Sequence, residues 1–244
     1  MDKRTVIVTG GSRGIGAAIS TRFAKEGFNV VINYVKNDEI SLNLKKDLEN
    51  KYNTDVLLVK ADVSNEDDVK RLIDETINKF GSINCLVNNA GIAIDKPFLD
   101  KTKDDFNKVL NTNLVGPFLT CKYAYNYLIN AKDSSIVNIT SKFGIETVYP
   151  ESMDYDASKS GLISLTKNLS RVFSPEVRVN AVAPGWVKTE MNSDLDKDFE
   201  KEEEDKILLG RFAEPEEIAN VVYFLSSSEA SYINGEVIVI DGGK

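Results

Sequence analysis

The sequence predicts a doubly wound parallel α/β sheet of about seven strands in three layers, α/β/α. Short β-branched runs alternate with stretches in which apolar residues recur at helical period. A glycine-rich turn follows the first run, and no repeat, Pro-rich linker or low-complexity tract interrupts the 244 residues. Strands separated by helices pair in parallel, because the chain must cross the sheet before it adds the next strand. One domain over residues 1–244 is therefore expected.

Seven strands are expected, at residues 5–9, 29–34, 56–59, 83–87, 135–140, 177–183 and 236–240. Helices are expected near residues 17–25, 67–79, 103–128, 154–172 and 215–225. A charge run from Asp194 to Lys206 lies between the sixth and seventh strands and predicts an acidic helix. This helix is either a solvated surface element or part of a substrate lid at about 190–212, since long insertions after a strand often cover a site.

Composition excludes several classes of protein. A formal net charge of −8 opposes binding to nucleic acid or to an anionic membrane, which clustered Lys and Arg would hold. The sequence has no histidine, which excludes Ser-His-acid hydrolases, Cys-His proteases and HExxH enzymes, and no metal site is expected. Cys85 and Cys121 lack CxxC spacing and are expected to be buried, reduced thiols. No apolar run reaches membrane-spanning length and no signal region is seen, so a cytoplasmic protein is expected.

The glycine-rich turn reads TGGSRGIG at 9–16, between the first strand and the first helix. Glycines there permit a tight turn and let a pyrophosphate approach the helix N–H groups, as in the Rossmann-type dinucleotide fold. The same residues match the GxSxG nucleophile pattern, but Ser12 has no histidine to activate it and is assigned to the turn or to phosphate binding. The candidate contacts in this turn are Gly10, Ser12, Arg13, Gly14, Ile15 and Gly16.

The end of the second strand indicates the cofactor. A carboxylate there would accept hydrogen bonds from the 2′-hydroxyl of NAD and repel a 2′-phosphate, but this strand ends in Asn33 and Tyr34. Arg13 and Lys36 are either flanking cations for a 2′-phosphate or ordinary surface residues. The prediction that NADPH is favoured over NADH rests mainly on the absence of a carboxylate at the end of this strand.

Two further segments are candidate adenosine contacts. Asp62 follows the third strand and either accepts a hydrogen bond from the adenine amino group or caps the helix that begins near Glu66. Small residues after the fourth strand would let the backbone run close to the adenosine ribose, or would simply form a turn. They are Asn89, Ala90 and Gly91.

Tyr155, Lys159 and Ser141 form the candidate catalytic group. Tyr155 and Lys159 are four residues apart on an expected helix and therefore share a face. A neighbouring ammonium and an oxidised nicotinamide are expected to bring the phenol nearer to operating pH, which makes Tyr155 the candidate general acid. Ser141 follows the fifth strand and is placed to hold a carbonyl oxygen, whereas strand alternation directs Thr140 away.

Asn113 lies in a helical stretch four residues before Pro117. Pro117 has no N–H to bond the carbonyl of residue 113, so that carbonyl is expected to be free. A kink without any chemical role is the alternative.

Taken together, these residues resemble the short-chain dehydrogenases/reductases. The resemblance rests on TGxxxGIG at 9–16, NNAG at 88–91, Asn113, Ser141, YxxxK at 155–159 and PGxxxT at 184–189, and it covers nearly the whole chain. Within the family the chain is most similar to 3-oxoacyl-(acyl-carrier-protein) reductases. The resemblance implies that Lys159 also binds the nicotinamide ribose, that Thr189 binds the carboxamide and that Asn113 holds a water of a proton relay. It adds Val63, Pro184, Gly185 and Val187 to the cofactor contacts.

The resemblance implies reduction of a 3-oxoacyl thioester in fatty acid synthesis, with acyl carrier protein as a candidate partner and a homotetramer formed through helices 103–128 and 154–172 and the last strand. Acidic residues at 200–205 oppose an acidic carrier, although Lys122, Lys132 and Arg171 offer a docking patch. A sugar, polyol, steroid or small ketone is the alternative substrate. A cofactor-binding regulator without turnover is the third interpretation, which the intact catalytic group disfavours.

Overall fold

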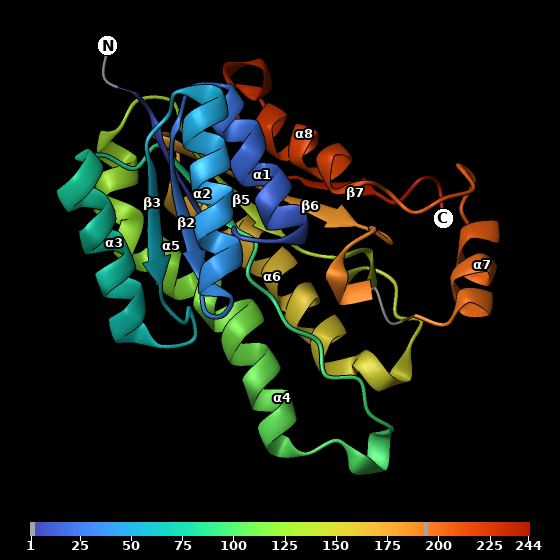
Figure 1. Cartoon of the computed structure of the whole chain (residues 1–244). Helices are drawn as coiled ribbons and strands as arrows, with labels where there is room; N and C mark the ends of the chain where they lie inside the picture. Colours follow the sequence, from blue (N-terminus) through green and yellow to red (C-terminus); the bar gives the residue numbers. More distant parts are fainter. Residues whose placement is uncertain (1–2, 193–194) are drawn as a thin grey trace.

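The computed structural model describes residues 3–192 and 195–244 and contains the predicted seven-stranded parallel sheet (Figure 1). The strand order is β3-β2-β1-β4-β5-β6-β7, so the chain reverses its direction of travel between the neighbours β1 and β4. Such a reversal opens a crevice at the carboxyl ends of the strands. The strands are β1 (Thr5–Val8), β2 (Asn29–Tyr34), β3 (Val56–Lys60), β4 (Cys85–Asn88), β5 (Ser134–Ile139), β6 (Val177–Pro184) and β7 (Val237–Ile240).

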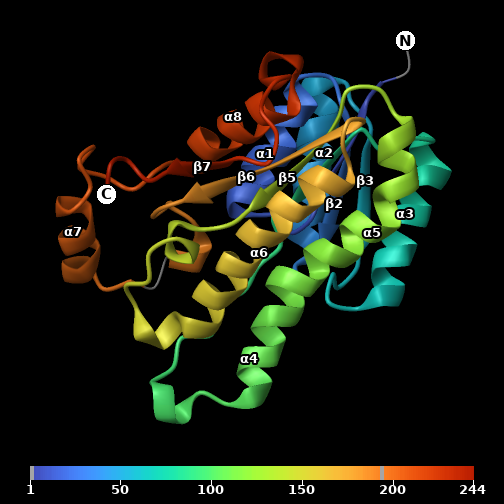
Figure 2. The ribbon, with the colours of Figure 1, turned by 180° about the vertical axis from the view of Figure 1, so that it is seen from behind.

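Helices cover both faces of the sheet (Figures 1 and 2). One layer holds α1 (Gly14–Lys25), α2 (Asp38–Tyr52) and α8 (Pro215–Ser226), and the other holds α3 (Glu66–Phe80), α5 (Gly116–Asn130) and α6 (Met153–Val172). Strand residues alternate between the two cores: Val6 and Val8 face the first layer, and Ile7 faces the second. Two further helices, α4 (Lys103–Leu110) and α7 (Lys197–Asp205), extend beyond the sheet.

The predicted helix 103–128 is interrupted. It consists of α4, a π-helical turn at Asn111–Val115, and α5. At the end of the π-helical turn, the N–H of Gly116 bonds the carbonyl of Asn111, five residues earlier. Helix α2 had no counterpart among the sequence-predicted helices, because its face toward the protein buries only Ser41 and Leu48 and gives little apolar periodicity. The predicted acidic helix is α7; Asp194, at the start of the predicted charge run, and Ser193 lie outside the described residues.

A chain of buried polar side chains joins the layers beneath the carboxyl edge. The hydroxyl of Thr120 on α5 donates to Asn88 Oδ1 at 2.6 Å. The amide of Asn88 on β4 donates to Asn138 Oδ1 at 2.8 Å, and the amide of Asn138 on β5 donates to the hydroxyl of Thr166 on α6 at 2.9 Å. All four side chains are buried, so these bonds replace those that water would make.

Both cysteines are buried and reduced, as predicted. Burial raises the pKa of the Cys121 thiol to about 12, which leaves it without nucleophilic character. Among the helices of residues 3–192 and 195–244, none combines the length and the apolar character needed to cross a membrane.

Candidate active site

The glycine turn at the carboxyl end of β1 folds too tightly for side chains. Gly10 and Gly14 have φ values of +60° and +50°, in the left-handed region that favours glycine. A Cβ atom on Gly16 would lie 2.1 Å from the carbonyl oxygen of Gly10. The turn therefore leaves the first N–H groups of α1 open at its mouth, which is the arrangement that binds a pyrophosphate.

Neighbouring strands hold this turn in place. Thr9 Oγ1 accepts hydrogen bonds from the main-chain N–H groups of Asn89 and Ala90, each at 3.0 Å. The amide of Asn89 donates to the carbonyl oxygens of Thr9 and Gly10 at 2.9 and 3.1 Å. Asn89 was predicted as a cofactor contact, whereas the role of Thr9 was missed, although its place directly before Gly10 was a signal.

Asn33 stabilises the glycine turn from the other side. It is 1% exposed; its Oδ1 accepts from Gly10 N–H at 3.3 Å, and its amide donates to the carbonyl of Ala61 at 2.7 Å. The side chain is enclosed between β1 and β3, so it positions the turn and does not present an amide to the crevice. This corrects its assignment as a direct cofactor contact.

The cations predicted beside the second strand differ in their surroundings. Arg13 and Lys36 are exposed, and neither side chain makes a hydrogen bond or ion pair with the described residues. Asp38, the first acid after the strand, bonds Lys60 at 2.9 Å. Burial, with a hydrogen bond to Asp38, raises the pKa of Tyr34. The charge of Asp38 is therefore offset by Lys60.

Asp62 keeps one oxygen available. Its Oδ1 accepts from the N–H and the hydroxyl of Ser64 at 2.9 and 2.7 Å. Asn65, not Asp62, caps α3, because Asn65 Oδ1 accepts from the N–H groups of Asp67 and Asp68. The capping alternative for Asp62 is therefore wrong. Val63 is buried and packs where α5 begins, 2.9 Å from the position of a Cβ on Gly116.

Lys159 and Tyr155 project from one face of α6, as their spacing predicted. The Lys159 ammonium lies 5.4 Å from the centroid of the Tyr155 ring and donates to the carbonyl of Ile139, at the end of β5, at 2.8 Å. Ser141 is buried at that end, accepts from the N–H of Phe143 at 3.2 Å, and hydrogen-bonds Tyr155. The hydroxyl of Thr140 instead bonds the carbonyl of Val182 at 2.7 Å, away from the site. The three predicted catalytic side chains thus meet at one point.

That Lys159 and an oxidised nicotinamide together bring the Tyr155 phenol nearer to operating pH stays a prediction, and the protein alone acts in the opposite direction. Burial raises the pKa of Tyr155 to about 12; the hydrogen bond from Ser141 acts against this rise, and the charges of Asp156 and Asp95 add to it. Burial also lowers the pKa of Lys159 to about 8. Because burial is the largest influence on both pKa values, the phenol keeps its proton at neutral pH.

Asn113 lies in the π-helical turn and faces the same point. Its Oδ1 accepts from Ile92 N–H at 2.9 Å, and its amide donates to the Ile92 carbonyl and to the hydroxyl of Ser158. A Cβ on Gly91 would lie 3.4 Å from both Asn113 Oδ1 and Lys159 Nζ. The π turn thus brings Asn113 beside Lys159, with Gly91 leaving the space between them.

The segment after β6 closes the other side of the crevice. Gly185 N–H bonds the carbonyl of Ile240, just beyond Pro184, and Val187 forms an isolated parallel bridge with Ala213. A Cβ on Gly14 would lie 3.3 Å from the methyl group of Thr189. A groove of about 630 Å³ opens here, and its lining includes Gly14, Thr189, Glu200 and Phe212. The glycine turn, the 184–189 segment and α7 therefore border one groove.

Known proteins resemble this chain in sequence and in fold. The family model described as enoyl-(acyl carrier protein) reductase matches residues 10–244. The 3-oxoacyl-[acyl-carrier-protein] reductase of Aquifex aeolicus is 39% identical over 97% of this chain and 95% of its own length, and that of Thermotoga maritima is 36% identical over 100% and 98%. The crystal structure of a dehydrogenase/reductase from Sinorhizobium meliloti 1021 superposes with a TM-score of 0.94 at 33% identity, covering 100% of this chain and 95% of that one.

A short-chain dehydrogenase/reductase from Serratia marcescens superposes with a TM-score of 0.93 at 32% identity, covering 98% of this chain and 97% of its own. The chain belongs to the short-chain dehydrogenase/reductase family. The protein is therefore a nicotinamide-dependent oxidoreductase that interconverts an alcohol and a carbonyl group.

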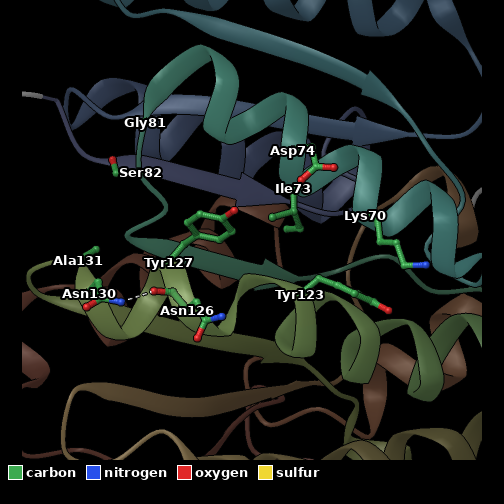
Figure 3. Close-up of a pocket in the computed structure, with 10 residues that line it drawn as sticks. All are labelled: Lys70, Ile73, Asp74, Gly81, Ser82, Tyr123, Asn126, Tyr127, Asn130 and Ala131. Atoms are coloured by element: carbon green, nitrogen blue, oxygen red, sulfur yellow. Dashed lines mark hydrogen bonds between the residues drawn. The ribbon is translucent and has the colours of Figure 1, made fainter.

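A second groove of the reductase lies away from this site. It has a volume of about 590 Å³ and runs between α3 and α5, with Tyr127 pointing from α5 toward α3 (Figure 3). Gly81 and Ser82, which line it, precede β4, so the groove opens at the amino ends of the strands. It contains none of the predicted site residues and is not the active site.

Proposed function

We propose that the reductase uses NADPH to reduce the ketone of a 3-oxoacyl thioester to a secondary alcohol, through Tyr155, Ser141 and Lys159. The observation that carries the proposal is the convergence of these three side chains beside Gly91, in the crevice that the glycine turn borders. The thioester is inferred from the relatives named as 3-oxoacyl-[acyl-carrier-protein] reductases.

The crevice fits a dinucleotide. The open N–H groups of α1 suit the pyrophosphate, the free oxygen of Asp62 suits the adenine amino group, and Thr189 borders the nicotinamide end. The side chains of Arg13 and Lys36 have no partner among the residues that the structure describes and are proposed to flank a 2′-phosphate, which favours NADPH. The cofactor, when bound, supplies the hydride that reduces the carbonyl carbon.

Side chains of the protein bind and protonate the carbonyl oxygen of the substrate. Ser141 donates a hydrogen bond to the carbonyl oxygen and fixes its place, and Tyr155 delivers a proton to it as negative charge develops. A Tyr155 phenol of pKa about 12 is protonated at neutral pH and is therefore ready to act as the acid. Lys159 and Asn113 resupply the proton through a water held between them, in the space that Gly91 leaves.

The carrier of the acyl group is the weakest supported part of the proposed substrate. Of the three cations in the candidate docking patch, Lys122 is paired with Glu66 at 3.2 Å, whereas Arg171 and Lys132 are exposed. The acidic helix α7 would repel an acidic carrier. These observations favour tests with a free thioester as well as with a carrier-bound one.

A homotetramer is the proposed assembly. Exposed apolar side chains on the predicted contact elements support it: Phe118 on α5 and Val239 on β7 are 46% and 45% exposed. Light scattering of the purified protein tests this assignment, and a monomer would contradict it.

The test of function follows the near-ultraviolet absorbance of NADPH with acetoacetyl thioester, crotonyl thioester, and simple ketones and sugars, each repeated with NADH. Turnover of the acetoacetyl thioester alone supports the proposal. Turnover of the crotonyl thioester alone would replace it with reduction of a carbon–carbon double bond, as in the description of the matching family model. Turnover of a sugar or simple ketone alone would retain the catalytic group and discard the thioester.

A further inference from the structure

Helix α7 is attached to the reductase along one narrow face. It stands beside the body of the molecule, near the ends of β6 and β7 (Figure 1). Its sequence, KDFEKEEED, is strongly acidic and mostly faces solvent. Phe199, Glu203 and, one turn later, Ile207 point toward the protein. The position of the whole helix therefore depends on this short stripe.

Glu203 is the unusual member of the stripe, because it is a carboxylate that is 1% exposed. Burying a carboxylate is strongly unfavourable unless donors replace water. Here Trp186 Nε1 donates at 2.9 Å, Lys206 at 2.7 Å, and Lys244 also donates. Burial, the largest single influence, would raise the pKa of Glu203, but hydrogen bonds from Lys206, Lys244, Tyr149 and Trp186 together outweigh it and lower the pKa to about 2. The carboxylate is thus charged and fully engaged at neutral pH.

One route of contacts leads from Glu203 to the catalytic group. The Trp186 ring stacks on Phe212, with centroids 5.4 Å apart and an interplanar angle of 12°, and meets the Phe143 ring edge-on at 5.6 Å. The N–H of Phe143 donates to Ser141 Oγ. The indole that Glu203 holds therefore packs against the residue that fixes the Ser141 hydroxyl.

A second route runs through residues 241–244. Lys244 donates to Glu203 from its side chain and accepts at its carbonyl from Lys142. Lys142, whose side chain is 7% exposed, also pairs with Asp241 at 2.7 Å. Because Lys142 directly follows Ser141, both routes from α7 end on the same catalytic segment.

We propose that Glu203 is a positioning residue of the reductase: it holds α7 and Trp186 together as one wall of the substrate end of the site and so sets the place of the substrate at Ser141. Tyr149 and Phe199 complete this wall, since each ring lies within 6.0 Å of Trp186. The inference rests on the proposed function only for its kinetic test.

Trp186 is the only tryptophan in the chain, so its fluorescence reports the state of this wall directly. We expect E203A to shift the emission to longer wavelength and to increase quenching by acrylamide at least about twofold, because the indole loses a charge-assisted hydrogen bond. E202A is the matched control, since Glu202 neighbours Glu203 but is 68% exposed and pairs only with Lys206. Emission of E203A equal to that of E202A would overturn the proposal.

Kinetics supply the second readout. We expect E203Q to raise KM for the thioester about tenfold and to leave kcat and NADPH binding within about twofold, because a positioning contact is lost and the chemical groups remain. W186F keeps a ring but removes the N–H, and it should raise KM in the same direction. If E203A fails to fold, E203Q and W186F test the positioning role of Glu203 in its place. A KM for the thioester that is unchanged in both variants would refute that role. A wild-type protein inactive toward thioesters would refute the proposed function, while the fluorescence of E203A would still decide the role of Glu203.

Discussion

The Lys159 ammonium lies 5.4 Å from the centroid of the Tyr155 ring, and both side chains leave the same face of α6. The ammonium lies against the ring without a direct hydrogen bond to the phenol. Lys159 instead donates to the carbonyl of Ile139, which ties α6 to the end of β5. The proton donor and the cation are thus fixed to the sheet edge that carries Ser141.

Replacing Tyr155 with Phe removes the proposed acid and keeps the ring. We expect kcat for thioester reduction to fall by roughly 10²- to 10⁴-fold, the usual contribution of a general acid, while NADPH still binds. Y127F is the matched control, because Tyr127 lies in the groove between α3 and α5. Assays stopped after several hours measure kcat, and titration followed by NADPH fluorescence measures cofactor binding. Wild-type turnover by Y155F would refute the assignment.

Ser141 and Thr140 are adjacent hydroxyls with different predicted effects. S141A removes the bond to the substrate oxygen and should lower kcat roughly 10²-fold. T140V removes a buried bond to the Val182 carbonyl, so we expect a loss of stability of about 1 kcal/mol with little change in kcat. Assays at saturating substrate together with urea unfolding separate the two outcomes. Equal kinetic losses in both variants would contradict the distinction.

The pKa of Lys159 predicts a pH limit. Burial lowers this pKa to about 8, so the ammonium loses its proton as pH rises through that value. Tyr155 is still protonated there, because its pKa is about 12. We therefore expect kcat/KM for reduction to be level below about pH 8 and to fall about tenfold per unit above it. A profile that stays level to pH 10 would show that the charge of Lys159 is not needed.

Asp156 is a source of pH-dependent instability. It is 5% exposed, and neither carboxylate oxygen has a hydrogen-bond partner within residues 3–192 and 195–244. Burial, followed by the charges of Asp95 and Asp154, raises its pKa to about 6. An acid whose folded pKa exceeds its unfolded value costs stability as pH rises from about 4 to 6, and the full cost remains above that range. We expect D156N to stabilise the protein by about 2 kcal/mol at pH 8 and little at pH 4. Thermal unfolding at both pH values measures this, and an equal gain at both would contradict it.

Cofactor choice is testable at the unpartnered cations. R13A and K36A should each raise KM for NADPH by roughly 10- to 100-fold and leave KM for NADH nearly unchanged, because a 2′-phosphate loses an ion pair. K25A, on the exposed side of α1, is the control. Equal effects on both cofactors would assign Arg13 to the pyrophosphate and remove the support for NADPH.

Local patterns predicted the strands and the proximity of Ser141, Tyr155 and Lys159 well. The carboxyl end of every strand lies within about one residue of its predicted place, because buried β-branched runs have few alternatives. The meeting of Ser141, Tyr155 and Lys159 followed from strand ends and helical spacing. The enclosure of Asn33 between β1 and β3 did not follow, because it depends on which strands are neighbours.

Long-range contacts explain the other features of the structure that the sequence did not predict. The partners of Glu203 lie at 186, 206 and 244, and no local pattern reveals that one acid of an acidic helix is buried. The π turn at Asn111–Val115 is fixed by the bonds of Asn113 to Ile92 and Ser158, which come from other elements. The burial that raises the pKa of Tyr155 was not predicted for a similar reason, since spacing shows the neighbouring charge but not the degree of enclosure.

The polar chain from Thr120 through Asn88 and Asn138 to Thr166 fixes the alignment of β4 and β5. A slip of one residue between these strands would leave buried amide groups without partners, which the apolar surroundings penalise. The same pairing sets Asn88 level with Asn138, so Asn89 follows one residue and Ser141 three residues beyond this level, both at the carboxyl edge of the sheet. A sequence change at Asn138 would therefore disturb both the cofactor turn and the catalytic hydroxyl, although it touches neither.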